Sequence, residues 1–132
     1  MNRILLIDDD DAIRDITAEI LRHAGHAVDT APDGNAGLAL HRAGQHDLII
    51  TDMVMPDMDG VELILALRHT KPRPRVIAVS GCSQFSAALF LPVAQRLGVQ
   101  RAIAKPFGAD VLLQAVAEVL AEPAPPTVLP AA

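Results

Sequence analysis

Acidic, hydroxyl and basic side chains stand where the short apolar stretches of this 132-residue chain end. Asp8 and Asp9 follow the first stretch, and Asp52 follows the third. Ser80 ends the fourth stretch and Lys105 follows the fifth. Oxygen ligands without paired His or Cys favour Mg²⁺, which with the ammonium group would neutralise much of the acidic charge. Such a site suits phosphoryl transfer, in which Asp52 would be a carboxylate nucleophile that forms an aspartyl phosphate.

Each of these residues taken alone has an ordinary structural role. An aspartate after a strand most often caps a helix or lies in a loop, a serine there is a turn hydroxyl, and a lysine is solvated. Asp10 and Asp11 are expected to be favourable charges at a helix N-terminus, and Asp57 and Asp59 to form turns. The five histidines lack the spacing of metal ligands, and we expect them on the surface. The functional interpretation is favoured because every group that it needs falls at the end of a strand.

The elements that must position these groups follow from the hydrophobic pattern. Short apolar runs predict strands at 3–7, 27–31, 47–51, 75–79 and 101–104. Apolar residues at helical spacing predict helices at about 13–24, 35–43 and 61–68, one within 86–97, and a last one capped by Asp110. Strands that alternate with helices imply an α/β fold with a parallel sheet covered on both faces. Right-handed crossovers then bring the carboxyl ends of all the strands to one edge.

Composition and charge narrow the class of protein. Residues 1–121 are expected to form one domain with one core, and the proline-rich segment 122–132 a disordered tail. A net charge of −5 and few aromatic residues argue against direct nucleic-acid binding. The apolar run at 4–7 is too short for a signal peptide or a membrane span. The single cysteine, Cys82, fits a reducing compartment, so we expect a cytoplasmic protein with no membrane partner.

As a set, these motifs resemble the receiver domain of two-component response regulators, in the form of a single-domain, chemotaxis-regulator-like protein. The resemblance covers about residues 2–121. It rests on the acidic pair Asp8-Asp9, Asp52 with the loop 53–60, Ser80, and the Lys-Pro-Phe run at 105–107. It implies a flavodoxin-like, doubly wound, five-stranded parallel sheet in the order 2-1-3-4-5.

The resemblance also implies a role for each site residue. Asp52 would accept a phosphoryl group from a sensor histidine kinase or a histidine phosphotransferase. Asp9, Asp52 and the backbone carbonyl of Val54 would bind Mg²⁺ directly, and Asp8 through water. The hydroxyl after the fourth strand and the ammonium group after the fifth would contact phosphoryl oxygens. The protein would signal to an unknown downstream partner as a phosphoacceptor and not as an enzyme, and a phosphorylation-dependent homodimer is one possible output.

Two regions depart from the pattern of the family. The family usually has an aromatic residue three positions before its lysine, and here that residue is Ala102. The stretch 81–98 is a few residues longer than usual, and its Phe85 and Phe90 could fill the space at Ala102 or form a partner surface. Pro92 suits a first turn, so the helix there is expected to start late or to be kinked. Without the aromatic residue, we expect the segment 81–91 to be the part that moves on phosphorylation.

Three other functions fit the sequence less well. Metal-dependent phosphohydrolases that resemble haloacid dehalogenases also use an aspartyl nucleophile, but they place a second aspartate two residues later, where this chain has Val54. A degenerate receiver that only binds a partner is disfavoured by the intact set of site residues. A nucleotide- or flavin-binding domain of similar fold is disfavoured because no Gly-rich phosphate loop follows the first strand.

Overall fold

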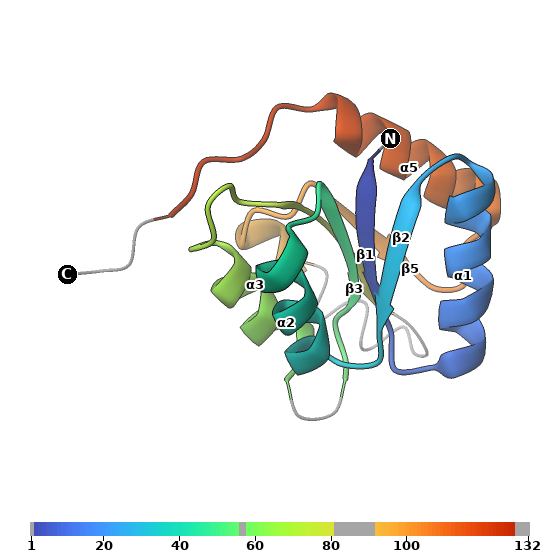
Figure 1. Ribbon diagram of the computed structural model, residues 1–132, viewed down its shortest axis with the longest axis horizontal. Coiled ribbons are helices and arrows are strands. Elements are labelled where there is room, and N and C mark those ends of the chain that lie inside the picture. The colour runs from blue at the N-terminus through green and yellow to red at the C-terminus, as the bar shows by residue number, and fades with distance from the viewer. Residues whose placement is uncertain (1, 56–57, 81–91, 129–132) are drawn as a thin grey trace.

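A five-stranded parallel sheet forms the centre of the molecule (Figure 1). The computed structural model describes residues 2–55, 58–80 and 92–128. The strands lie in the order β2-β1-β3-β4-β5, and every neighbouring pair is parallel. The predicted fold class and strand order are therefore confirmed. The strands are β1 (Arg3–Ile7), β2 (Ala27–Ala31), β3 (Leu48–Asp52), β4 (Arg75–Ser80) and β5 (Arg101–Ala104).

Helices join the strands, and aspartates start three of them. The helices are α1 (Asp11–His23), α2 (Gly34–Gly44), α3 (Gly60–Leu67) and α5 (Ala109–Ala121), and residues 92–96 are also helical. Asp10, Asp33 and Asp59 each accept a hydrogen bond from a backbone N–H three residues on, at 3.0, 2.8 and 2.9 Å. Such caps satisfy N–H groups that have no partner inside the helix. None of the helices in the described ranges is long and apolar enough to cross a membrane.

Some element boundaries differ from the sequence predictions. β3 lies one residue further along than expected, because Asp52 still pairs with Val79 in the ladder between β3 and β4. Asp110 does not cap α5: the N-cap is Gly108, and Asp110 lies in the first turn, where its charge favours the helix dipole. The helix predicted within 86–97 is helical at 92–96, which places Pro92 at the start of these described residues. Residues 81–91 lie outside the described ranges.

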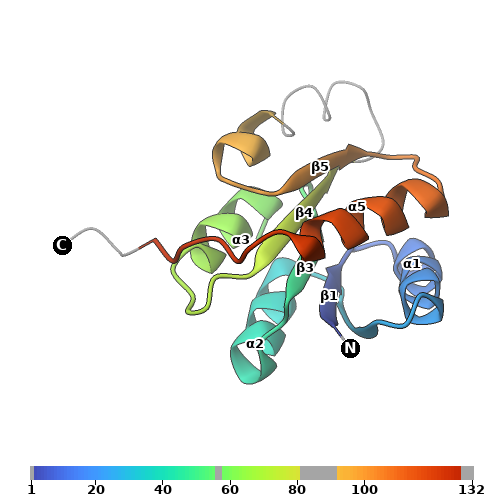
Figure 2. The ribbon, with the colours of Figure 1, turned by 90° about the horizontal axis from the view of Figure 1, so that it is seen from above.

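The core has two layers because successive residues of a strand point to opposite faces of the sheet. Leu5 and Ile7 pack on the face covered by α2 and α3, whereas Ile4 and Leu6 pack on the face covered by α1 and α5. Figure 2 shows α1 and α5 together on one side of the sheet, with α2 and α3 on the other. Burial on both faces explains why the runs of the central strands β1, β3 and β4 are mostly apolar, whereas the edge strands β2 and β5 are less buried. This rigid sheet fixes where its carboxyl-end residues lie.

The chain beyond α5 runs back toward the turn between α3 and β4 (Figure 2). The Arg75 guanidinium donates two hydrogen bonds to the carbonyl oxygen of Glu122, at 3.0 and 2.6 Å. The backbone N–H of Val128 donates to the carbonyl of Arg68 at 2.8 Å. Residues 122–128 therefore follow the edge of the sheet at which the strands begin. The domain boundary at residue 121 and the disorder of the tail remain predictions.

Candidate functional site

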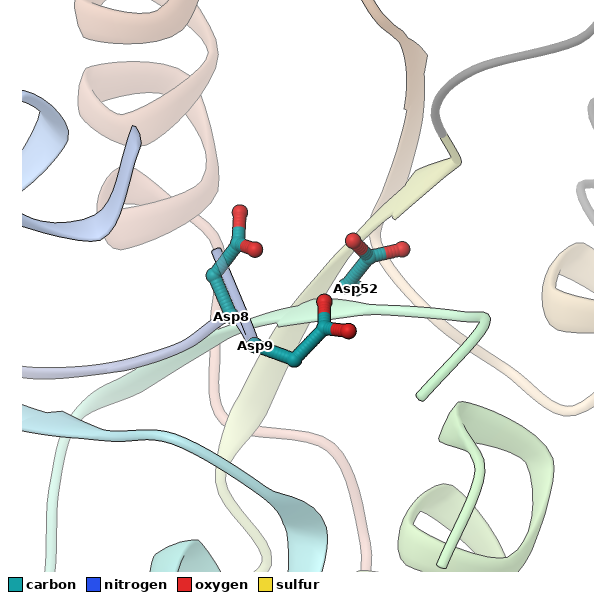
Figure 3. A group of neighbouring side chains, drawn as sticks. All are labelled: Asp8, Asp9 and Asp52. Carbon is teal, nitrogen blue, oxygen red and sulfur yellow. The ribbon is translucent and has the colours of Figure 1, made fainter. Parts of the chain in front are cut away.

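Three carboxylates gather at the carboxyl edge of the sheet (Figure 3). Asp8 and Asp9 follow β1, and Asp52 ends the neighbouring strand β3. Their potential ligand oxygens all lie within 4.8 Å of one another, and among the described residues they are the one such group able to hold a metal ion. Asp8 and Asp52 are only 5% and 8% exposed, whereas Asp9 is exposed. The acidic pair and the third aspartate, which lie 43 or more residues apart in the sequence, therefore form one site.

Backbone and side-chain donors hold the loop between β1 and α1 in place. The backbone N–H of Asp10 donates to Oδ1 of Asp8 at 2.9 Å. The guanidinium of Arg14 donates to the backbone carbonyl of Asp8 at 2.8 Å and to the carboxylate of Asp11 at 2.6 Å. Sequence reasoning missed Arg14, although its place one turn into α1 after an acidic run was a usable signal. Arg14 thus fixes the direction in which the acidic pair leaves β1.

Lys105 crosses the site from the end of β5. Its Nζ donates to Oδ2 of Asp8 at 2.7 Å and to Oδ2 of Asp52 at 3.2 Å. Its backbone N–H donates to the carbonyl of Ser80 at 2.7 Å, which ties the ends of β4 and β5 together. One ammonium group therefore partly neutralises two largely buried carboxylates, which would otherwise repel each other.

The electrostatics of the site leave Asp52 harder to ionise than an ordinary aspartate. Burial raises the pKa of Asp52, and the nearby Asp8 raises it slightly further, while Lys105 and the backbone N–H of Val54 oppose the shift. Burial alone would lower the pKa of Lys105, but its hydrogen bond to Asp8 and the charges of both carboxylates outweigh burial and raise it. The two pKa shifts have different causes, because burial raises the pKa of Asp52 whereas the neighbouring carboxylates raise that of Lys105.

The remaining predicted site residues flank the acidic group. Ser80 ends β4 and is 1% exposed, and its Oγ has no hydrogen-bond partner within the described part of the chain. The backbone N–H of Val54 donates to Oδ1 of Asp52 at 3.3 Å, and the Val54 side chain is 48% exposed. Ala102 lies within β5 and pairs with Ala78. Phe85, Phe90 and Cys82, for which the sequence suggested roles, lie outside the described ranges.

The donor set of the site fits Mg²⁺. Carboxylate oxygens are the ligands that this ion prefers, and Asp9 is exposed, so waters can complete the coordination. The excess negative charge that remains beside Lys105 gives a reason for a cation to bind. Asp8, Asp9 and Asp52 are the side chains that would hold it.

The protein is a doubly wound α/β domain of the receiver type. This class is defined by the strand order and by an acidic group and a lysine at the carboxyl edge of the sheet. The chain belongs to the response regulator receiver domain family, whose model matches residues 4–117. It is therefore a signalling domain of two-component systems, as the sequence motifs indicated. The phosphohydrolase and nucleotide-binding alternatives are not favoured.

Relatives with known names support the same assignment. The chain is 37% identical over 128 residues to the DNA-binding transcriptional regulator NtrC of Azospirillum brasilense, which covers 97% of this chain and 26% of that protein. It is 34% identical over 119 residues to the sensor kinase CckA of Brucella abortus, covering 89% of this chain and 12% of that protein. It therefore spans about a quarter or less of these two relatives.

Solved structures of similar length share the whole fold. A CheY-like response regulator receiver domain protein from Methanospirillum hungatei JF-1 superposes with a TM-score of 0.81 at 32% identity, over 91% of this chain and 94% of that one. The chemotaxis response regulator CheY4 of Vibrio cholerae gives a TM-score of 0.80 at 28% identity, over 90% of this chain and 98% of that one.

Proposed function

We propose that Asp52 is the phosphoacceptor of this receiver domain and takes its phosphoryl group from a phosphohistidine of a sensor histidine kinase or a histidine phosphotransferase. The observation that carries the proposal is the position of Asp52 between an acidic pair and Lys105 at the open edge of the sheet. In the reaction, a carboxylate oxygen of Asp52 forms a bond to phosphorus while the bond from phosphorus to the histidine nitrogen breaks. The electron pair of that bond stays on the nitrogen, so the donor histidine is regenerated.

Lys105 and Ser80 have distinct roles in this proposal. The Lys105 ammonium is already within hydrogen-bond distance of Asp52, so it can follow the negative charge that the phosphoryl group brings. The Ser80 hydroxyl has no partner within the described residues and is free to donate to a phosphoryl oxygen. Forming these two bonds would draw the ends of β4 and β5 toward Asp52, which supplies a conformational signal. Mg²⁺, when bound, supplies positive charge that neutralises the phosphoryl oxygens.

A direct test is incubation with acetyl phosphate and Mg²⁺ followed by intact-mass measurement. We expect the mass of one added phosphoryl group, and peptide mapping should place it on the peptide that contains Asp52. Addition at another aspartate, or no addition at any donor concentration, would contradict the proposal.

Removing Asp9 should abolish the response of the protein to Mg²⁺. Ligand binding to the native state raises stability by mass action, so millimolar Mg²⁺ should raise the melting temperature of the wild type. Asp9→Ala should lose this gain because it removes the exposed carboxylate of the group. The matched control is Asp15→Ala, which removes a carboxylate from α1 outside the acidic group. An equal Mg²⁺ response in Asp9→Ala and the wild type would remove Asp9 from the site.

The phosphoryl-donor protein is proposed to pack on the apolar face of α1. Ile13 and Ile16 are 38% and 63% exposed. A cavity of about 270 Å³ between these residues and Phe107 reaches Lys105, so this apolar face adjoins the phosphoacceptor site. A protein that brings a phosphohistidine to Asp52 would cover it, and burial of exposed apolar surface would favour the complex.

Ile16→Asp tests this docking face without touching the chemistry. Transfer from a histidine-kinase or phosphotransferase donor should slow by tenfold or more, because a charge would be buried in the interface. Phosphorylation by acetyl phosphate should be unchanged. Leu65→Asp, which changes an exposed apolar residue of α3 (41% exposed), is the control and should leave both rates unaltered. Equal slowing with both donors would mean that Ile16 acts on the site itself.

Phosphorylation is proposed to act through an unidentified downstream protein, with dimerisation as one possible form of output. We also propose a cytoplasmic location, which the single cysteine supports, and no direct nucleic-acid contact by this domain, which the net charge of −5 supports.

A further inference from the structure

Two histidines that the sequence analysis placed on the surface are instead buried against each other. His41 lies in the last turn of α2 and His46 just before β3, and they are 2% and 6% exposed. Their rings are stacked, with centroids 5.5 Å apart and planes inclined by 30°. The site of Asp52 lies at the other end of β3, so neither histidine takes part in it. Buried titratable groups of this kind need hydrogen-bond partners in a defined protonation state.

The hydrogen bonds define where the protons are. The backbone N–H of His46 donates to Nδ1 of His41 at 3.0 Å, so this nitrogen is an acceptor and carries no proton. The proton of the neutral His41 ring is therefore on Nε2, which is buried and has no partner among the described residues. Nδ1 of His46 lies 3.3 Å from the same acceptor, and its Nε2 lies 2.7 Å from a carboxylate oxygen of Asp29. The second contact ties the His46 ring to β2.

The charged groups around His41 disfavour a further proton on it. Arg3, from β1, donates to the carbonyl of Gln45 at 3.1 Å and to Asp29 at 3.4 Å. Arg42 and Lys71 line, with His41, a cleft of about 220 Å³ between the end of α2 and the turn after α3. The acidic groups nearby are already engaged, Asp29 by His46 and Asp47 by the backbone N–H of Arg3 at 2.8 Å.

The two buried histidines do not fit a metal site. The Nδ1 lone pair of His41 already accepts the backbone N–H of His46. Among the described residues, the only group of three potential metal ligands is the acidic one at the other edge of the sheet. A structural metal needs three or four protein ligands.

We propose that His41, His46 and Asp29 form a proton-sensitive latch that holds the end of α2 and the loop 45–47 against β1 and β2, and that opens on acidification. The only nitrogen of His41 free to take a proton is Nδ1. A proton there would remove the acceptor for the backbone N–H of His46 and place a positive charge in a buried site beside Arg3. The loop that these bonds hold would then separate from α2, and water could enter from the adjoining cleft.

The direction of the pH effect follows from the protonation of the open and closed forms. Burial, with smaller contributions from the charges of His46 and Arg3, lowers the pKa of His41 to about 4. In the open form the ring is hydrated and takes a proton near the ordinary value of about 6.5. Between pH 6.5 and pH 4, the equilibrium constant for opening should rise by about tenfold for each unit that the pH falls, and by roughly 300-fold over the whole range. The hydrogen bond to His46 lowers the pKa of Asp29, so protonation of this carboxyl adds to the effect only at still lower pH.

Amide hydrogen exchange of the complete chain between pH 7 and pH 4.5 tests the latch. The opening constant of the His46 amide, corrected for the intrinsic pH dependence of exchange, should rise by about tenfold per pH unit below pH 6.5. His41→Asn keeps an acceptor near the position of Nδ1, but the asparagine side chain does not titrate. In this variant the opening constant of the His46 amide should therefore be independent of pH. His23→Asn changes an exposed histidine of α1 and should behave as the wild type.

NMR of the His41 ring in the wild type gives a measurement that needs no variant. The ring should remain in the neutral form with its proton on Nε2 until the pH approaches 4. A flat opening constant in the wild type, a pH dependence that persists in His41→Asn, or titration of the His41 ring near pH 6.5 would each overturn the proposal.

Discussion

Asp52→Asn should take up no phosphoryl group from acetyl phosphate or from any phosphohistidine donor. The variant should keep the fold and be slightly more stable than the wild type. The amide is close in shape to the carboxylate but is a poor nucleophile. Because burial raises the pKa of Asp52, ionising this carboxyl costs more free energy in the folded protein than in the unfolded chain. Removing that charge should therefore raise the free energy of unfolding of the metal-free protein by about 1 kcal/mol. The stability gain should shrink as the pH falls and the wild-type carboxyl becomes protonated.

Intact mass and urea unfolding measure the two parts of this prediction on the same sample. Asp47→Asn is the matched control, because Asp47 lies just before the same strand at its other end and contacts Arg3 instead of the acidic group. It should be phosphorylated as fully as the wild type. Full incorporation of phosphate into Asp52→Asn would rule out Asp52 as the acceptor.

Lys105→Met should cause the largest loss of stability that a single side chain at the site can produce. The Lys105 side chain is 14% exposed, and the side chains of its two partners, taken without their backbone, are 7% and 10% exposed. Removing it leaves two buried carboxylates without a counter-charge, which typically costs about 3–5 kcal/mol. The pKa of Asp52, which Lys105 now holds down, should rise further. The loss of stability should therefore be largest at pH 7 and become smaller as the pH falls and the unpaired carboxylates take up protons.

Urea unfolding at pH 7 and pH 5 measures both the deficit and its pH dependence. Lys71→Met, which changes the only other lysine of the chain and one that is exposed, should leave stability within about 0.5 kcal/mol of the wild type. In the double variant with Asp52→Asn, the cost of losing Lys105 should be smaller, because one of the two unpaired charges is gone. An equal cost in both backgrounds would mean that Lys105 stabilises the fold through packing and not through charge.

Local patterns were sufficient to predict the strands and to place the acidic, hydroxyl and basic side chains at their carboxyl ends. Strands that are buried on both faces leave continuous apolar runs, and polar residues at the ends of those runs marked the carboxyl edge. The strand order, by contrast, came from resemblance to a family, since apolar runs do not encode which strands are neighbours. Gly60 illustrates a limit of reading turns from residue type. It was expected in a loop, but it begins α3, where an added Cβ would lie 2.7 Å from Cα of Met53.

The buried histidine pair could not be predicted from the sequence. His41 and His46 are five residues apart, which is neither a helical nor a strand spacing, and they meet only because the chain turns between α2 and β3. Their partner Asp29 belongs to β2 and joins them through the order of the strands. Burial of a histidine is decided by tertiary contacts that no local pattern contains. Arg14 is a different case, because its partners Asp8 and Asp11 lie within six residues of it and the acidic run before it was a usable signal.

The path of residues 122–128 decides where anything attached after them would sit. These residues leave α5 and are held by Arg68 and Arg75 beside the turn that precedes β4. Asp52 lies at the opposite end of the sheet, at the end of β3. A fluorescent reporter or an affinity tag joined after Val128 would therefore emerge beside α3, remote from the acidic residues. For biosensor construction, this exit point allows labelling or immobilisation without blocking access to Asp52.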